Sequence, residues 1–175
     1  MIQNLTKNQR EVLNYFIQNL DSEIHLRGLS EEIELSYSST RRGLKELRKQ
    51  GLLESEGKGN MKLYRPSGEK FRKVKKLINL EKLEDSGLIE FLEKELRSEA
   101  IVLFGSYLEG RDKSESDIDL AAIGGREKEL DLSSFEEEMG REIQLTRVED
   151  LKKEDSEFRN TLANGLVLKG YLEVV

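Results

Sequence analysis

The sequence predicts an α+β protein of two units, and three observations support this fold class. Apolar residues in the front half repeat mostly at helical spacing and end in an alternating hairpin pattern. The later residues mix short apolar runs with helical patterns, as in a small α/β unit with a mixed sheet. Charge divides at the same place, because residues 1–80 carry a net +6 and residues 81–175 a net −12. Uneven scatter is the simpler alternative to a polyanion-binding front half.

The first expected element is a helix. Thr6 and Gln9 form a capping-box pattern, and apolar residues follow at helical spacing as far as Leu20. This pattern predicts a helix of about 14 residues. A short strand is expected around Ile24.

Two more helices follow with a tight turn between them. The second is expected over residues 29–35, and the third over residues 38–50. Gly51 closes the third helix, because glycine accepts the left-handed conformation that ends many helices. Two short helices joined so closely are typical of a helix-turn-helix.

Cations dominate the outward side of the third helix, whose inward side is marked by Leu44 and Leu47. A solvated helix face is the ordinary interpretation of such a charge run, but residues 52–65 then predict a β-hairpin with a basic tip at Lys58. The order helix, strand, helix, helix, hairpin resembles the winged helix-turn-helix family over residues 1–66. The resemblance implies binding of double-stranded DNA, with the third helix in the major groove and the wing along the backbone. The expected contacts come from Ser38, Ser39, Thr40, Arg41, Arg42, Lys45, Lys49 and Lys58. Winged helices also mediate protein contacts, so that alternative stays open.

A boundary is expected at Pro66, the single proline of the chain. Beyond it, residues 69–80 predict a cationic helix with an apolar stripe. We expect residues 67–85 to be a helical connector, with a contact in a homodimer as the alternative.

The most informative segment joins a glycine-serine pair to two aspartates. A short apolar run ends at Phe104 and is followed by Gly105 and Ser106, ten further residues, and then Asp117 and Asp119 at the start of a second apolar run. Side chains two residues apart point to the same face of a strand, so the two carboxylates can converge. Mg²⁺ binds through one or two carboxylates plus substrate phosphates. Backbone N–H groups of the glycine-serine turn can meet those phosphates.

Each half of this pattern has an ordinary interpretation, as a solvated turn or a loop. Joined at this spacing after a strand, the two halves resemble the signature of the DNA polymerase β-like nucleotidyltransferase superfamily, and of its minimal prokaryotic members, over residues 86–175. The resemblance implies transfer of a nucleoside monophosphate from a triphosphate, with ATP expected, to an acceptor hydroxyl. It implies that Gly105 and Ser106 bind the nucleotide and that Asp117 and Asp119 hold Mg²⁺. A helical HEPN-type protein is a partner implied by the minimal members.

The sequence departs from the family pattern at two positions. Gln144 stands where the resemblance implies a third catalytic acid, and glutamine has no ionisable carboxyl. Glu142, two residues earlier, is an alternative candidate for that role. Glu109 stands where arginine is frequent, and Arg111 and Lys113 are the expected compensating contacts to nucleotide. These departures support an alternative function as a catalytically impaired regulator that senses nucleotide or binds a protein.

The remaining elements and the composition narrow the picture. Helices are expected near residues 133–139 and 156–163, and strands near residues 142–146 and 166–172. The absence of cysteine excludes disulfides and thiolate metal sites, and a single histidine excludes a histidine-based zinc site. Without a long apolar run or signal core, we expect a cytoplasmic protein with no membrane association.

Overall fold

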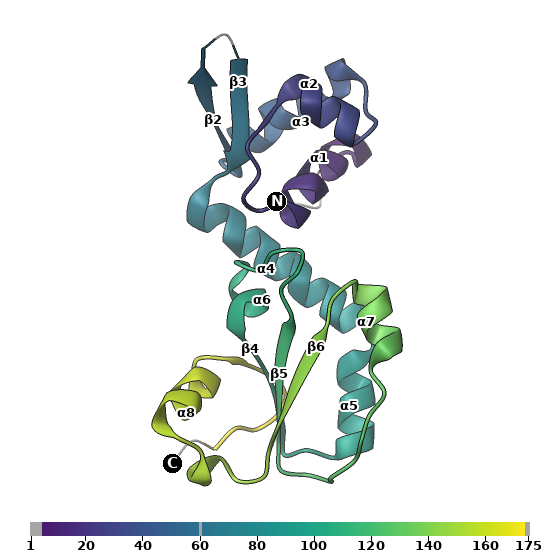
Figure 1. The fold of residues 1–175 in the computed structure, drawn as a ribbon, viewed down its shortest axis with the longest axis vertical. Coiled ribbons are helices and arrows are strands. Elements are labelled where there is room, and N and C mark those ends of the chain that lie inside the picture. Colours follow the sequence, from purple (N-terminus) through teal and green to yellow (C-terminus); the bar gives the residue numbers. More distant parts are fainter. Residues whose placement is uncertain (1–4, 60, 174–175) are drawn as a thin grey trace. The chain divides into compact units, whose positions relative to one another are not determined.

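The computed structural model describes residues 5–59 and 61–173, which form two compact units. The first unit ends at Lys75 and the second begins at Lys76, so the division falls within α4, Gly68–Asp85 (Figure 1). A three-stranded sheet with the order β1-β3-β2 and a four-stranded sheet with the order β6-β5-β4-β7 confirm the α+β class. Among the residues described, no helix is long and apolar enough to cross a membrane.

Helix α1, Lys7–Gln18, begins with the predicted capping box. Thr6 Oγ1 accepts from the backbone N–H of Gln9, and the Gln9 side chain accepts from the backbone N–H of Thr6. The helix ends early because the backbone and side-chain amides of Asn19 both donate to the Tyr15 carbonyl. It is therefore 12 residues long, and Leu20 lies beyond it.

The second helix is displaced from its predicted position. Helix α2, Leu26–Glu32, follows directly on the short strand β1, Ile24–His25. It ends before residue 35 because Glu34 has a φ of 52°, which lies outside the range of a right-handed helix. Helix α3, Tyr37–Lys49, is capped by the Ser36 hydroxyl, and Gly51 behind it has the expected positive φ of 70°.

The wing is a hairpin of β2, Leu53–Lys58, and β3, Met61–Pro66. The strands are antiparallel from the pair Leu53 and Pro66 to the pair Lys58 and Met61, and β1 adds to the other edge of β3. Asn60, which belongs to the expected basic tip, lies outside the described residues. This order of elements is that of a winged helix-turn-helix.

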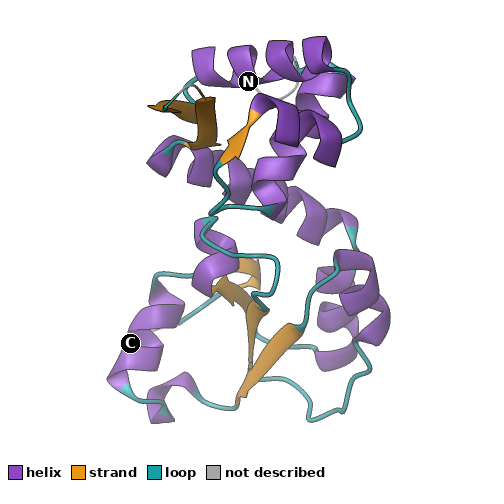
Figure 2. Ribbon diagram, turned by 45° about the horizontal axis from the view of Figure 1, so that its top comes forward, coloured by secondary structure: helices purple, strands orange, loops and turns teal. Residues whose placement is uncertain are grey.

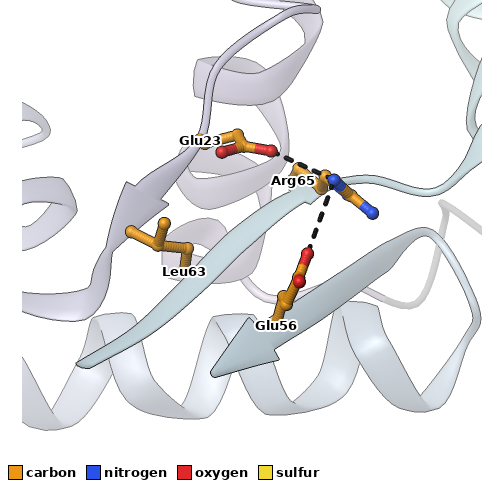
Figure 3. A pocket seen from close by; sticks show the side chains of 4 residues that line it. All are labelled: Glu23, Glu56, Leu63 and Arg65. Atoms are coloured by element: carbon orange, nitrogen blue, oxygen red, sulfur yellow. Dashed lines mark hydrogen bonds and ion pairs between the residues drawn. The ribbon is translucent and has the colours of Figure 1, made fainter. Parts of the chain in front are cut away.

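One arginine joins the three segments of the small sheet (Figure 3). Arg65 of β3 donates from Nη1 to Glu23 at 3.0 Å, and its Nη1 lies 3.8 Å from Glu56. Its Nε donates to Glu54 at 2.7 Å. A small pocket of about 190 Å³ is lined by Glu23, Glu56, Leu63 and Arg65. Three carboxylates surround one cation here, so this part of the wing sheet does not attract phosphate. The exposed ion pairs themselves add little stability.

The second unit builds a four-stranded mixed sheet from strands that are separated by helices. Strand β4 is antiparallel to both β5 and β7, whereas β5 and β6 are parallel. The elements in chain order are α5 (Leu88–Leu96), β4 (Ala100–Phe104), α6 (Gly105–Glu109), β5 (Ile118–Ile123), α7 (Ser133–Met139), β6 (Ile143–Val148), a 3-10 helix (Leu151–Lys153), α8 (Ser156–Ala163) and β7 (Leu166–Gly170).

Helices cover the two faces of this sheet differently (Figure 2). Helices α5 and α7 pack on the face that receives Ile118 and Leu120 of β5. Helix α8 packs on the opposite face, against Ala121 and Ile123, through Phe158 and Leu162. Because side chains alternate along a strand, Asp119 shares the face covered by α8.

Candidate active site

The two aspartates lie two positions apart at the start of β5. Asp119 is half-buried and pairs with Phe104 at the end of β4, and Asp117 directly precedes the strand. Burial raises the pKa of the Asp119 carboxyl, and the like charge of Asp117 raises it further. Two carboxylates that repel one another across one residue form a site that a cation would stabilise.

Gly105 lies against Asp119, and this approach requires glycine. Its φ is +74°, and a Cβ on its backbone would come within 2.1 Å of Asp119 Oδ2. Any larger residue would strain the backbone and displace the carboxylate. Gly105 and Ser106 form the first turn of α6 immediately after β4, so the predicted phosphate turn is a neighbour of the Asp119 carboxylate.

The neighbour of Asp119 on its other side is Gln144. The parallel pairing of β5 with β6 sets Asp119 opposite Gln144, and the backbone N–H of Ile118 donates to the Glu142 carbonyl at 2.9 Å. Glu142 precedes β6 and is exposed. Within residues 5–59 and 61–173, no group of three His, Cys, Asp or Glu side chains is placed to hold a metal ion.

This donor set fits Mg²⁺. The charges of the two carboxylates interact, and Gln144, whose side chain carries an amide oxygen, is the partner of Asp119 on the adjacent strand. Mg²⁺ requires only one or two protein carboxylates when phosphates and water complete its shell. The two aspartates are enough to hold the metal, but the site has no third carboxylate at position 144 to accept a proton from an attacking hydroxyl.

A buried polar network holds the segment between the turn and the aspartates. The side-chain amide of Asn79 donates to Asp112 Oδ1 at 2.8 Å and to the Tyr107 carbonyl at 2.9 Å. The Tyr107 hydroxyl donates back to the Asn79 carbonyl at 3.2 Å. Burial raises the pKa of Tyr107 to about 12. The network fixes α6 against α4 within the second unit.

Arg141 extends this network to the segment that precedes Asp117, and the sequence analysis missed it. Its guanidinium donates to the fully buried Asp112 at 2.7 Å and to the carbonyls of Ser116, at 2.7 Å, and Lys113. It thereby ties the segment that ends at Asp117 to the start of β6. No local pattern identifies such a residue, because its partners lie 25 to 29 positions away.

The other residues predicted to bind nucleotide lie on the surface of this segment. Arg111 forms an ion pair with Glu109, and both side chains are about half exposed. The pair offsets the negative charge of Glu109, as the sequence analysis anticipated for this pair of residues. Lys113 is exposed, and its backbone N–H donates to the Ser116 hydroxyl.

The predicted DNA-contacting residues are mostly on the surface of α3. Arg41, Arg42, Lys45, Lys49 and Ser38 are exposed, and Ser39 is partly exposed. Thr40 is a correction: it is fully buried, and its hydroxyl donates to the Ser36 carbonyl at 3.1 Å, so it cannot contact phosphate. The side chain of Lys58 lies outside the part of the chain that the structure describes.

A hollow of about 410 Å³ lies between the first turns of α1 and α3. It is lined by Lys7 and Arg42 together with polar residues that include Thr6 and Ser39. Two helix N-termini and two cations favour a phosphate group there. Lys7 was not singled out in the sequence, although a cation in the first helical turn was a visible signal.

Comparisons with known proteins give one family match. Residues 86–170 match the model of a family described as "Polymerase beta, Nucleotidyltransferase". No curated protein matches the chain. Similar solved structures include a homodimeric winged helix-turn-helix DNA-binding domain of Mycobacterium bovis, described as a possible ArsR-family transcriptional regulator, at 18% identity and a TM-score of 0.39 over 47% of this chain and 72% of that chain. A possible transcriptional regulator from Methanosarcina mazei is 24% identical with a TM-score of 0.37, over 53% of this chain and 81% of that chain.

Proposed function

We propose, on the premise that residues 86–170 form a polymerase β-type nucleotidyltransferase domain, that the second unit binds a nucleoside triphosphate with Mg²⁺ and transfers its nucleoside monophosphate to an acceptor hydroxyl. The acceptor oxygen bonds to the α-phosphorus, and pyrophosphate leaves as the bond between the α- and β-phosphates breaks. The observation that carries this proposal is the close approach of Gly105 to Asp119. It supports a common site for triphosphate and metal.

The residues have distinct roles in this proposal. Asp117 and Asp119 hold the metal, and Gly105 and Ser106 receive the phosphates. Mg²⁺ bound there supplies positive charge to the reacting phosphate, and charge neutralisation and positioning provide most of the acceleration in such transfers. Arg111 and Lys113 add positive charge at the rim.

The position beside Asp119 decides how efficient the chemistry is. Gln144 can offer its carbonyl oxygen to the metal but cannot accept a proton from the attacking hydroxyl. Glu142 is the nearest carboxylate along β6 in sequence, and the proposal leaves the proton-accepting role to it or to water.

Gln144 also favours a second candidate function, a regulator that binds nucleotide without turning it over. The two functions separate when the protein is incubated with α-labelled ATP, Mg²⁺ and candidate acceptors. Covalent label on an acceptor supports the transferase. Label that remains bound as ATP and is never transferred supports the regulator, and absence of any binding contradicts both.

The first unit is proposed to bind double-stranded DNA. The exposed cations of α3 and the hollow beside Lys7 and Arg42 support backbone contacts. In an electrophoretic mobility-shift experiment, the protein is expected to retard a DNA duplex, and added salt is expected to reverse this binding. A HEPN-type protein remains a proposed partner of the second unit, and co-purification with such a protein tests it.

A further inference from the structure

A cleft of about 580 Å³ opens between α6 and α8, next to the proposed triphosphate turn. Phe104 and Gly105 form one side of it, and these residues also border Asp119. Its volume lies within the range of roughly 300–1,000 Å³ that is usual for small-molecule sites. The cleft and the aspartates share one face of the sheet, because α8 packs on the face that Asp119 occupies.

Helix α8 presents an unusual outward face to this cleft. Glu157, Asn160, Thr161 and Asn164 follow the spacing that places side chains on one side of a helix, while Phe158 and Leu162 pack inward. Charged residues make up 37% of the chain, yet three of these four outward residues are neutral hydrogen-bonding groups. On α7, by comparison, the exposed residues include the charged pair Glu137 and Glu138.

Hydrogen-bonding capacity on this face remains open. Asn160 is exposed, and it accepts the hydrogen bond from Asn164 through its backbone carbonyl and not through its side chain. The amide of Asn164 donates to the Asn160 carbonyl at 2.8 Å, which leaves its side-chain oxygen available as an acceptor. Each amide can offer both a donor and an acceptor to the edge of a planar heterocycle.

Away from Gly105, the lining of the cleft suits an uncharged ligand better than further phosphate. Its lining in the described part of the chain includes the carboxylates of Glu109 and Glu157 but no lysine or arginine. Carboxylates accept hydrogen bonds from sugar hydroxyls. Phe104 supplies an aromatic ring, which meets Phe158 edge to face at 6.0 Å between centroids and can stack with a base.

We propose that this cleft binds the nucleoside of the triphosphate, with the base at Asn160 and Asn164 and the ribose hydroxyls at Glu109 or Glu157. The order of strands supports placing the nucleoside on the side of β7. Gln144, at the position of the third acid, lies on β6 at one edge of the sheet, whereas the cleft lies beyond β4 on the side of β7. The attacking hydroxyl and the nucleoside thus approach from opposite sides of the phosphates. The inference rests on the proposed function of the site.

The test compares ATP with inorganic tripolyphosphate, which carries the phosphates without a nucleoside. Calorimetry in Mg²⁺ is expected to show that the wild-type chain binds ATP at least about tenfold more tightly. In the variant Asn160→Ala with Asn164→Ala, that preference disappears while tripolyphosphate affinity stays unchanged. Gln18→Ala, which removes an exposed amide from the end of α1, serves as the control and keeps the preference.

The outcomes separate the two proposals. A variant that still prefers ATP, or a wild-type chain that binds both ligands equally, overturns the nucleoside cleft and leaves the phosphate site in place. Failure of both ligands to bind the wild-type chain overturns the proposed function together with this inference. If the double alanine variant also loses affinity for tripolyphosphate, its two asparagines do not act on the nucleoside alone, and the nucleoside cleft is contradicted.

Discussion

Asp119 of β5 and Gln144 of β6 are direct partners in a parallel pair of strands. The site therefore pairs a carboxylate with an amide where the family resemblance implies two carboxylates. An amide oxygen is a neutral ligand, so this pairing preserves a place for a cation while lowering the negative charge around it.

Replacing the amide by a carboxylate should increase transfer activity. Gln144→Asp is expected to raise the rate of label transfer by about 100-fold or more, which is the usual contribution of a positioned general base. Gln144→Asn keeps an amide on a shorter side chain and is the control. Equal rates for wild type and Gln144→Asp, measured with saturating ATP and Mg²⁺, would count against this assignment.

Gly105→Ala should disrupt the site beyond its effect on the backbone. Its Cβ would meet Asp119 Oδ2, whereas Gly87 has a similar φ of +71° and no atom within 4 Å of an added Cβ. Both alanine variants are expected to lose about 1 kcal/mol of unfolding free energy through left-handed strain. Only Gly105→Ala should weaken binding of Mg²⁺ and triphosphate, measured by calorimetry. Similar losses of affinity in the two variants would argue against the close approach.

Stability should fall at alkaline pH because of Tyr107. Burial holds its pKa at about 12, above the ordinary value of 10, so the folded state binds the proton more tightly than the unfolded state. The unfolding free energy is thus unaffected below pH 10 and decreases, by about 2 kcal/mol, as pH rises from 10 to about 12.

Tyr107→Phe should remove that decrease. The variant also loses the hydrogen bond to the Asn79 carbonyl, so it should be about 1 kcal/mol less stable near neutral pH. Denaturant unfolding at about pH 8 and about pH 11 checks both effects. An identical alkaline decrease in both proteins would show that Tyr107 does not cause it.

DNA binding should depend on the exposed arginines of α3. Removing Arg41 and Arg42 together is expected to weaken duplex binding and to reduce the slope of log affinity against log salt by about 2. Arg27→Ala is the control, because this exposed arginine of α2 is already paired with Glu31 at 3.1 Å. Fluorescence anisotropy over a salt series measures the slopes, and equal slopes for the two variants would contradict a role for α3.

The sequence predicted correctly those helix ends that are formed by residues close together in the chain. The capping box at Thr6 and the glycine at position 51 are formed by neighbours within a few residues. The burial of Thr40 was also readable, since it lies four residues before Leu44 on the same stripe of α3. Its hydroxyl suggested a surface contact, but the helical spacing placed it inside.

Long-range contacts account for what the sequence did not reveal. Arg141 bonds to partners 25 to 29 residues away, and the cleft beside α8 depends on the packing of α8 against β4. The displaced start of α2 follows from its direct continuation of β1, which pairs with β3 some 40 residues later in the chain. Spacing within a short window carries no information on such pairings.

The most direct measurement of the central claim is calorimetric titration of a non-hydrolysable ATP analogue into the wild-type chain and Asp117→Ala, each with and without Mg²⁺. The account predicts binding that requires Mg²⁺ in the wild-type chain and is lost in Asp117→Ala, whose circular dichroism spectrum stays unchanged. Equal affinity of the two proteins in Mg²⁺ would contradict it.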